Sequence, residues 1–477
     1  MINRTRRVAA ACVLLTGLLN AFARAEVALP RVLGDHMVLQ RDRQLPIWGT
    51  AGSGESITVR FGAQSHSATA DASGNWKVML DPMPASATPA DLTVSGNNTV
   101  TLSDILVGEV WMCSGQSNME FPMRGAQGMR QLPPMAEALA KATNPAIRLF
   151  RVEKNEREFA TAGWTPCTPE TAGPFSAVGY FFGKELSDQL NVPVGLIQSC
   201  WGGSHIERWT PAEAYEKSPI FASKATTKPV RIDNQRAGQY FEPMVRPLIP
   251  FAIRGMIWYQ GESNIINSND GVHYLDKFKV FVDSWRAMWG QGDFPVYTVQ
   301  IAPYYYTRRN DPLKHSPEEL PLLWEAQSLA LYMPHIGMAG TIDLVDDFAN
   351  IHPPDKWTVG HRLALWALAK DYGREIVHSG PIYKSVEFKD GKARVFFYSS
   401  GSGLATRDDK PPIDFQLAGR DGAFKPAVAA IEGSTVVVSS PDVPQPENVH
   451  FAWTETAQPN LINKEGLPAI PFRTNRP

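Results

Sequence analysis

The sequence has few cysteines, no strong excess of either charge and no long apolar run beyond its N-terminus. Four cysteines among 477 residues are too few for a disulfide-dense fold. A net charge of −2 and an isoelectric point near 6.6 argue against nucleic-acid binding by phosphate neutralisation. After the N-terminus, no apolar segment approaches the ~20 residues that cross a bilayer. With 43% hydrophobic and 20% charged residues, the chain is expected to be globular, with neither nucleic-acid nor membrane partners.

Motifs that bind metal ions or phosphates are absent as well. The sequence contains no HExxH motif and no CxxC pair, and its ten histidines are scattered. It also lacks the glycine-rich fingerprint that cradles phosphate groups. We therefore expect an active site that uses neither a metal ion nor another cofactor.

The first 25 residues have the features of a secretory signal peptide. Three arginines precede an apolar run over residues 8–19, and Ala23-Arg24-Ala25 fits the A-x-A cleavage rule. Cleavage near Ala25 leaves Glu26 as the new N-terminus. We therefore expect a periplasmic or secreted protein.

Three cysteines remain after this cleavage. Cys113 and Cys200 each end an apolar, strand-like run, which favours buried free thiols. A single disulfide bridge to Cys167 is the alternative in an oxidising compartment.

Three regions of the chain differ in their residue patterns. Residues 26–105 contain short strand-like runs at intervals of roughly ten residues, which is typical of a β-sandwich. Residues 106–380 alternate apolar runs with amphipathic stretches. Residues 381–477 return to strand-like runs, which predict a second β-rich region.

The alternation in the middle region predicts an α/β fold. Strands are expected at Ile105–Met112, Val194–Cys200 and Ile253–Tyr259, and helices at Val178–Leu190 and Tyr274–Trp289. This spacing indicates βαβ units and a parallel sheet covered by helices on both faces. Ligands bind outside the carboxyl ends of such strands, so the residues after each strand are the candidates for chemistry.

The first two of these strand ends carry a candidate nucleophile and candidate oxyanion donors. In the segment Gly115–Glu120, Ser117 lies at a strand-to-loop corner that can expose its hydroxyl and nearby N–H groups. After the next strand, Gly202 and Gly203 let a backbone N–H approach a developing oxyanion. An ordinary turn is the alternative for both segments.

Two later loops supply the other groups that acyl transfer needs. Gln260 and Asn264 offer amide donors after the third strand, and Glu262 offers a carboxylate that could orient a histidine. His352 precedes the last helix, and its neutral imidazole can take a serine proton near pH 7. The four loops together therefore favour a serine hydrolase.

Several segments together carry a family resemblance. They are Val32–Arg41, Gly108–Glu120, Trp258–Asn264, Ile351–Pro353 with Lys356, and Asn460-Leu461 with Gly466–Ala469. In these segments the chain resembles the sialate O-acetylesterase-type carbohydrate esterases of the SGNH-hydrolase superfamily. The resemblance implies a flavodoxin-like α/β catalytic domain with β-rich accessory parts. It also implies removal of acetyl groups from sugar hydroxyls without a cofactor, on sialic acids or on plant cell-wall polysaccharides such as xyloglucan or xylan.

Transferred to this sequence, the resemblance makes Ser117 the nucleophile and His352 the base. Many SGNH enzymes place an aspartate three residues before the histidine, but that position here is Ala349. Glu262 is therefore the first candidate for the third triad member and Asp346 the second, and a Ser–His dyad is a third interpretation.

The resemblance leaves the oxyanion hole with alternatives. Its backbone donors are the N–H of Ser117 and that of either Gly202 or Gly203, and its side-chain donor is Gln260 or Asn264. Four aromatic residues are candidates for stacking on sugar rings, with packing in the core as the alternative: Trp201, Trp209, Trp258 and Tyr304. The rival functions are a non-catalytic carbohydrate-binding protein with a degenerate hydrolase domain, and a glycosidase that uses the acid-rich loop 343–347.

Overall fold

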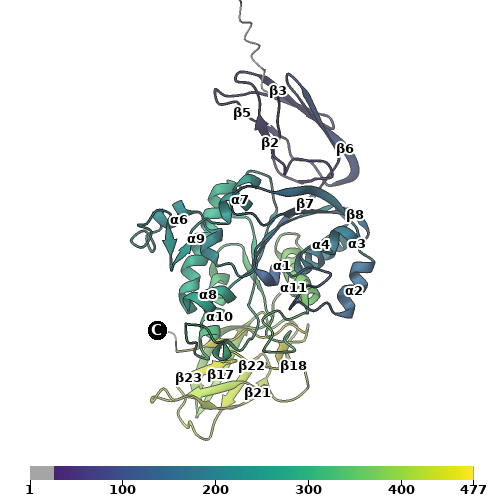
Figure 1. Ribbon diagram of the computed structural model, residues 1–477. Helices are drawn as coiled ribbons and strands as arrows, with labels where there is room; N and C mark the ends of the chain where they lie inside the picture. The colour runs from purple at the N-terminus through teal and green to yellow at the C-terminus, as the bar shows by residue number, and fades with distance from the viewer. Residues whose placement is uncertain (1–25, 476–477) are drawn as a thin grey trace, which may run out of the picture.

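The structure is a computed structural model that describes residues 26–475 (Figure 1). The expected signal peptide, residues 1–25, lies outside the described residues. A β-rich layer at the N-terminal end, a central sheet flanked by helices and a β-rich C-terminal region follow one another along the molecule (Figure 1). In the described part of the chain, no helix has the length and apolarity needed to cross a membrane.

The central sheet has the strand order of a flavodoxin-like fold. Five parallel strands lie side by side in the order β15-β14-β13-β7-β10. Their bounds are β7 (Thr99–Gly115), β10 (Val194–Cys200), β13 (Gly255–Tyr259), β14 (Val296–Val299) and β15 (Ile336–Ala339). Counted along the chain this order is 5-4-3-1-2, so the strand order reverses next to β7, where such sheets bind ligands.

Two further strands extend the sheet beyond β10. Strand β8 (Asn144–Val152) pairs with β10 in parallel, and β9 (Thr161–Cys167) closes the edge in an antiparallel orientation. The residue pattern of the sequence did not indicate this pair of strands. The predicted class, an α/β fold with a parallel sheet of SGNH-hydrolase type, is confirmed.

Helices cover both faces of the sheet (Figure 1). On one face, α4 (Ala177–Leu190) packs against α11 (Lys356–Lys370), and on the other α9 (Tyr274–Trp289) packs against α10 (Glu319–Leu329). Ser176 caps α4, because its hydroxyl accepts a hydrogen bond from the N–H of Gly179 at 3.0 Å. The close approach of α11 to α4 requires Gly360, where a Cβ would lie 2.9 Å from the carbonyl oxygen of Val178.

The N-terminal layer is continuous with the central sheet through β7. Strands β3 (Ser56–Phe61), β4 (Gln64–Thr69) and β6 (Ser86–Ser95) form a sheet with the first half of β7. Strands β2 (Leu45–Thr50) and β5 (Asn75–Leu80) form a second sheet, and β1 (Val38–Gln40) joins β7 in parallel. The boundary expected at residue 105 thus falls inside one 17-residue strand.

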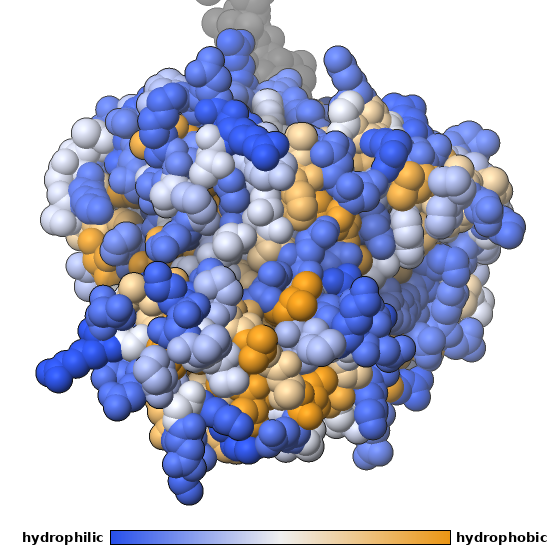
Figure 2. All heavy atoms as spheres, turned by 90° about the horizontal axis from the view of Figure 1, so that it is seen from below, coloured by the Kyte–Doolittle hydropathy of each residue, from blue (hydrophilic) through white to orange (hydrophobic). Residues whose placement is uncertain are grey.

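The C-terminal region consists of small antiparallel sheets. One has the order β16 (Ile382–Lys389), β17 (Lys392–Tyr398), β22 (Thr435–Ser439) and β21 (Val428–Glu432). Another has the order β20 (Lys425–Pro426), β19 (Phe415–Ala418), β23 (Asn448–Phe451) and β25 (Phe472–Arg473), and β18 (Leu404–Thr406) pairs with β24 (Leu461–Asn463). Seen from below, this end of the molecule carries apolar side chains in small groups among polar ones (Figure 2).

Short elements connect these parts. They are α1 (Ser117–Glu120), α2 (Pro133–Ala140), α3 (Pro169–Ala172), α5 (Ile206–Trp209), α6 (Ala212–Lys217), β11 (Arg231–Ile232), β12 (Gln235–Arg236), α7 (Phe241–Met244) and α8 (Glu262–Ser268), with 3-10 turns at Arg246–Leu248, Gly271–His273, Tyr306–Arg308 and Ala330–Tyr332. The three cysteines of the described chain, Cys113, Cys167 and Cys200, are buried and free, as the apolar runs before Cys113 and Cys200 predicted for those two.

Candidate active site

A serine and a histidine are in contact at the carboxyl end of the central sheet. Strand β7 ends at Gly115, whose φ of +141° and close approach to the Tyr259 carbonyl leave no room for a side chain. Ser117 then begins α1, and its Oγ lies 2.9 Å from Nε2 of His352, which comes from the loop before α11. Ser117 lines a pocket of about 400 Å³. The structure thus brings together the two residues predicted as nucleophile and base.

The imidazole of His352 is held in its neutral form. Burial, and then the positive charge of Lys356, lower the pKa of His352 to about 4. An interaction with the backbone of Gly128 acts in the opposite direction on this pKa, while Nε2 of the ring faces Ser117. A neutral imidazole in this place can accept the serine proton near pH 7.

Glu262 does not contact His352, contrary to the prediction that it orients the ring. Its Oε1 instead accepts a hydrogen bond of 2.5 Å from Nδ2 of Asn118, the residue that follows the nucleophile. The same Nδ2 donates to the carbonyl of Ile351 at 3.1 Å, next to His352 in the chain. The structure therefore corrects the expected role, because Asn118 stands between Glu262 and the loop that carries the histidine.

Lys356 completes this buried group. Its ammonium donates to Oδ1 of Asn118 at 2.7 Å and lies over the rings of Phe121 and Tyr259. Burial lowers the pKa of Lys356 to about 7 and raises the pKa of Glu262. The two opposite charges share one asparagine, so the carboxamide of Asn118 ties the nucleophile turn to the histidine loop.

Asp346, the alternative third member, lies on the surface. Its carboxylate forms an ion pair with Arg130, and both side chains are at least half exposed. Arg130 belongs to the same loop as Gly128, where a tight turn is closed by two hydrogen bonds of 2.9 Å between Ala126 and Met129. In the described chain neither proposed carboxylate contacts the ring of His352, and the group found there is the backbone of Gly128.

The structure distinguishes the two candidate oxyanion glycines. A Cβ at Gly202 would lie 3.3 Å from the Cβ of Ser117, whereas a Cβ at Gly203 would have no neighbour within 4 Å. The N–H of Gly202 donates to Oε2 of Glu120 at 2.7 Å, and Lys154 donates to the other carboxylate oxygen at 2.6 Å. Gly202 thus faces the nucleophile, and its N–H already points at a negatively charged oxygen.

The candidate amides Gln260 and Asn264 lie in a buried network instead of the pocket. Nε2 of Gln260 donates to Oδ1 of Asn264 at 2.7 Å and to Oε1 of Gln116 at 3.1 Å. Nδ2 of Asn264 donates to Glu207 at 3.0 Å and to Asp270 at 2.8 Å. Because these bonds use the donors of both amides, neither side chain is available to a developing oxyanion, which corrects this prediction.

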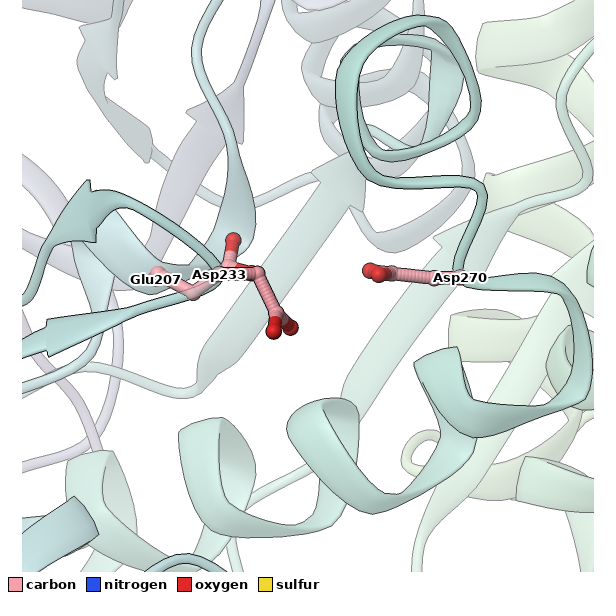
Figure 3. A group of neighbouring side chains, drawn as sticks. All are labelled: Glu207, Asp233 and Asp270. Atoms are coloured by element: carbon pink, nitrogen blue, oxygen red, sulfur yellow. The ribbon is translucent and has the colours of Figure 1, made fainter. Parts of the chain in front are cut away.

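This network ends at three acids, and Figure 3 shows Asp270 opposite Glu207 and Asp233. Glu207 on α5, Asp233 in the β11–β12 turn and Asp270 after α8 place their carboxylate oxygens within 4.8 Å of one another. The ammonium of Lys277 lies 2.5 Å from Glu207 and 2.7 Å from each aspartate. The ammonium of Lys277 thus occupies the position that a metal ion would take, and the cluster braces helix α8, which carries Asn264.

Two of the four predicted sugar-stacking residues belong to the core. Trp209 and Trp258 are fully buried, so their rings cannot meet a ligand, and this prediction is wrong for both. Trp201 is half-buried and stacks on Tyr240 with a centroid distance of 4.4 Å. Tyr304 packs against its neighbour Tyr306 outside the pocket of Ser117. Of the four, Trp201 alone adjoins the Gly202 loop.

A flavodoxin-like sheet with a serine and a neutral histidine in contact at the carboxyl ends of its strands has the architecture of an SGNH-type hydrolase. Residues 107–368 match the family model described as "Carbohydrate esterase, sialic acid-specific acetylesterase". Sialate O-acetylesterase of Homo sapiens is 30% identical over 390 residues, which cover 74% of this chain and 73% of that protein. The Mus musculus sialate O-acetylesterase is 29% identical over 420 residues, covering 74% and 75%.

A solved structure agrees with these relatives. A carbohydrate acetylesterase from Xanthomonas citri superposes with a TM-score of 0.84 at 37% identity, covering 94% of this chain and 99% of that chain. The chain belongs to the sialic acid-specific acetylesterase family of carbohydrate esterases. It is an esterase, as the sequence predicted.

Proposed function

We propose that the protein removes O-acetyl groups from carbohydrate hydroxyls through an acetyl-enzyme formed on Ser117. The observation that carries this proposal is the contact of 2.9 Å between the Ser117 hydroxyl and a neutral His352. His352 takes the serine proton as Oγ attacks the acetyl carbonyl, and the sugar oxygen leaves with that proton. Water then hydrolyses the acetyl-enzyme along the same proton path. This geometry argues against a degenerate hydrolase domain.

The oxyanion of the tetrahedral intermediate is proposed to be bound by the backbone N–H groups of Ser117 and Gly202. The carboxylate of Glu120 must leave the Gly202 N–H when the acetyl group enters, because both oxygens need the same donor. The displaced carboxylate of Glu120 would still have Lys154 as its hydrogen-bond partner. The backbone of Gly128 is proposed to hold the imidazole in place of a triad carboxylate, so the catalytic pair is a dyad with a main-chain orienter.

Alanine at Gly202 is expected to lower kcat for p-nitrophenyl acetate by about 10- to 100-fold, because the new Cβ crowds Ser117 and the Gly202 N–H. Alanine at Gly203 faces open space, although its φ of +72° costs roughly 1 kcal/mol of stability. The Gly203 variant is therefore expected to keep most of its kcat, which makes it the matched control. Equal losses in both variants, measured at a temperature where both are folded, would remove Gly202 from its proposed role.

The activity is expected to persist to lower pH than an ordinary histidine base allows. Because the pKa of His352 is lowered to about 4, kcat/KM for p-nitrophenyl acetate should stay constant from about pH 7 to about pH 5. It should then fall about tenfold per pH unit below pH 4, as the imidazole becomes protonated. A decline centred near 6.5, the value of a free histidine, would contradict this prediction.

The same shift affects folding in a defined direction. Since the ring binds a proton less readily in the folded than in the unfolded chain, stability falls as pH drops from about 6.5 to about 4. Circular dichroism at each pH separates this loss of structure from the titration of the catalytic base.

We also propose a periplasmic or extracellular site of action, following removal of residues 1–25. The acetylated sugar is proposed to be a sialic acid or a plant cell-wall polysaccharide. Acetate release from O-acetylated sialic acid, acetylxylan and acetylated xyloglucan oligosaccharides tests these alternatives directly. N-terminal sequencing of the exported protein, with Glu26 expected as its first residue, tests the location.

A further inference from the structure

A second pocket lies where the edge of the central sheet meets the C-terminal region. It has a volume of about 490 Å³ and lies between the start of β15 and strands β16 and β17. Tyr332 and Tyr398, which are 75% and 51% exposed, both line it. Among the described residues, one other large aromatic side chain is exposed, Phe388 at 38%, and it lies outside the pocket. We call this site the tyrosine pocket.

The wall of the tyrosine pocket carries the charge of Lys370 beside two histidines, and burial holds the pKa of His378 below its ordinary value. Lys370, His335 and His378 contribute to its wall, and no acidic residue does. The ammonium of Lys384 lies 5.3 Å from the centre of the Tyr398 ring. The pocket therefore offers aromatic faces beside two lysine ammonium groups that form no ion pair with an acid among the described residues.

The tyrosine pocket is separate from the active site. The two pockets share no lining residue. Strand β15 is three strands away from β7, which corresponds to about 14 Å across the sheet. Ser117 follows the carboxyl end of β7, whereas the tyrosine pocket includes Ile336 at the amino end of β15. A molecule in this pocket would leave the nucleophile accessible.

We propose that the tyrosine pocket binds a carbohydrate chain that bears carboxylate groups. Tyrosine rings present flat apolar faces to the C–H faces of sugars and hydroxyls to their oxygens. A sugar carboxylate gains from the unpaired Lys370 and Lys384. This inference rests on the proposed function for the choice of a glycan as ligand, and it adds a second site that holds an acidic polymer on the enzyme during deacetylation.

The binding test uses the full chain with Ser117 replaced by alanine, so that binding is measured without turnover. Calorimetry with hexagalacturonate is expected to show binding that Tyr332→Ala and Tyr398→Ala each weaken by about 2- to 10-fold. Phe388→Ala, the matched exposed aromatic outside the pocket, should leave the affinity unchanged. Lys370→Ala should weaken hexagalacturonate binding and leave the weaker binding of uncharged cellohexaose unaltered.

Two results would overturn this inference. One is an affinity for hexagalacturonate that neither tyrosine substitution changes, since binding would then occur elsewhere. The other is cellohexaose binding as tight as that of hexagalacturonate, which would remove the role of charge. Hydrolysis of p-nitrophenyl acetate by the chain with Ser117 intact tests the proposed function separately, because the tyrosine pocket is not needed for a small ester. The tyrosine variants should retain that hydrolysis in full.

Discussion

Replacing Ser117 with alanine is expected to lower kcat for acetyl-ester hydrolysis by roughly 10⁴-fold or more. The substitution removes the oxygen that lies 2.9 Å from His352 and leaves every other group of the site in place. Since the Ser117 hydroxyl makes no hydrogen bond within the described chain besides the one to His352, the fold should be unaffected. The measurement is kcat for p-nitrophenyl acetate together with the thermal midpoint of each protein.

Ser103→Ala provides the matched control, because Ser103 is an exposed serine on β7, the strand that leads to Ser117. That variant should retain the activity of the unmodified protein. Rapid acid quenching followed by peptide mass spectrometry should find one acetyl group on the peptide that contains Ser117. A folded Ser117→Ala protein with most of its activity would exclude the acetyl-enzyme mechanism.

The position of the catalytic pair could be predicted because it follows from periodicity. The alternation of apolar and amphipathic segments indicates parallel strands, and parallel strands bring their carboxyl ends to one edge. Ser117 and His352 lie 235 residues apart in sequence, yet both follow this rule and meet at that edge. For the same reason the expected strand Val194–Cys200 and helix Tyr274–Trp289 have exactly these bounds in the structure.

The group that holds His352 could not be predicted from side chains. The ring meets the backbone of Gly128, and every residue has a backbone carbonyl, so the sequence carries no signal for it. Asn118 and Glu120 belong to the nucleophile segment, but the sequence does not show their roles. Asn118 accepts a hydrogen bond from Lys356, and Glu120 accepts one from Gly202, and both donors are distant in sequence. Such pairings are set by the packing of loops, and hydrophobic periodicity does not determine them.

Aromatic residues were ambiguous for a different reason. Trp258 lies in β13, whose five residues are all buried, and Trp209 packs against it edge to face at 6.3 Å. The sequence alone does not tell whether a tryptophan at a strand end packs in the core or contacts a ligand. The burial of its side chain in the structure decides between the two. The domain boundary expected near residue 105 shows the same limit of residue patterns. The pattern changes there, but the single strand β7 runs through that position.

The second large effect is expected from Asn118→Leu, which should lower the free energy of unfolding by about 3–5 kcal/mol. The leucine has a similar volume but removes both the amide that donates to Glu262 and the oxygen that accepts from Lys356. Both charged groups are fully buried, and an unpaired buried charge is far more costly than a lost neutral hydrogen bond. Urea unfolding followed by fluorescence measures this loss.

Glu262→Gln is the second informative substitution, because it tests whether Glu262 orients His352. A glutamine oxygen can still accept from Nδ2 of Asn118, and the change removes a buried charge whose pKa is already raised. We therefore expect kcat within about tenfold of the unmodified protein, whereas loss of a true histidine orienter costs several orders of magnitude. Asp346→Asn should also be mild, because that carboxylate pairs with Arg130 at the surface. A severe loss of kcat in Glu262→Gln alone would restore Glu262 as the third triad member. If Glu262 only supports Asn118 by accepting its hydrogen bond, a glutamine oxygen can do the same.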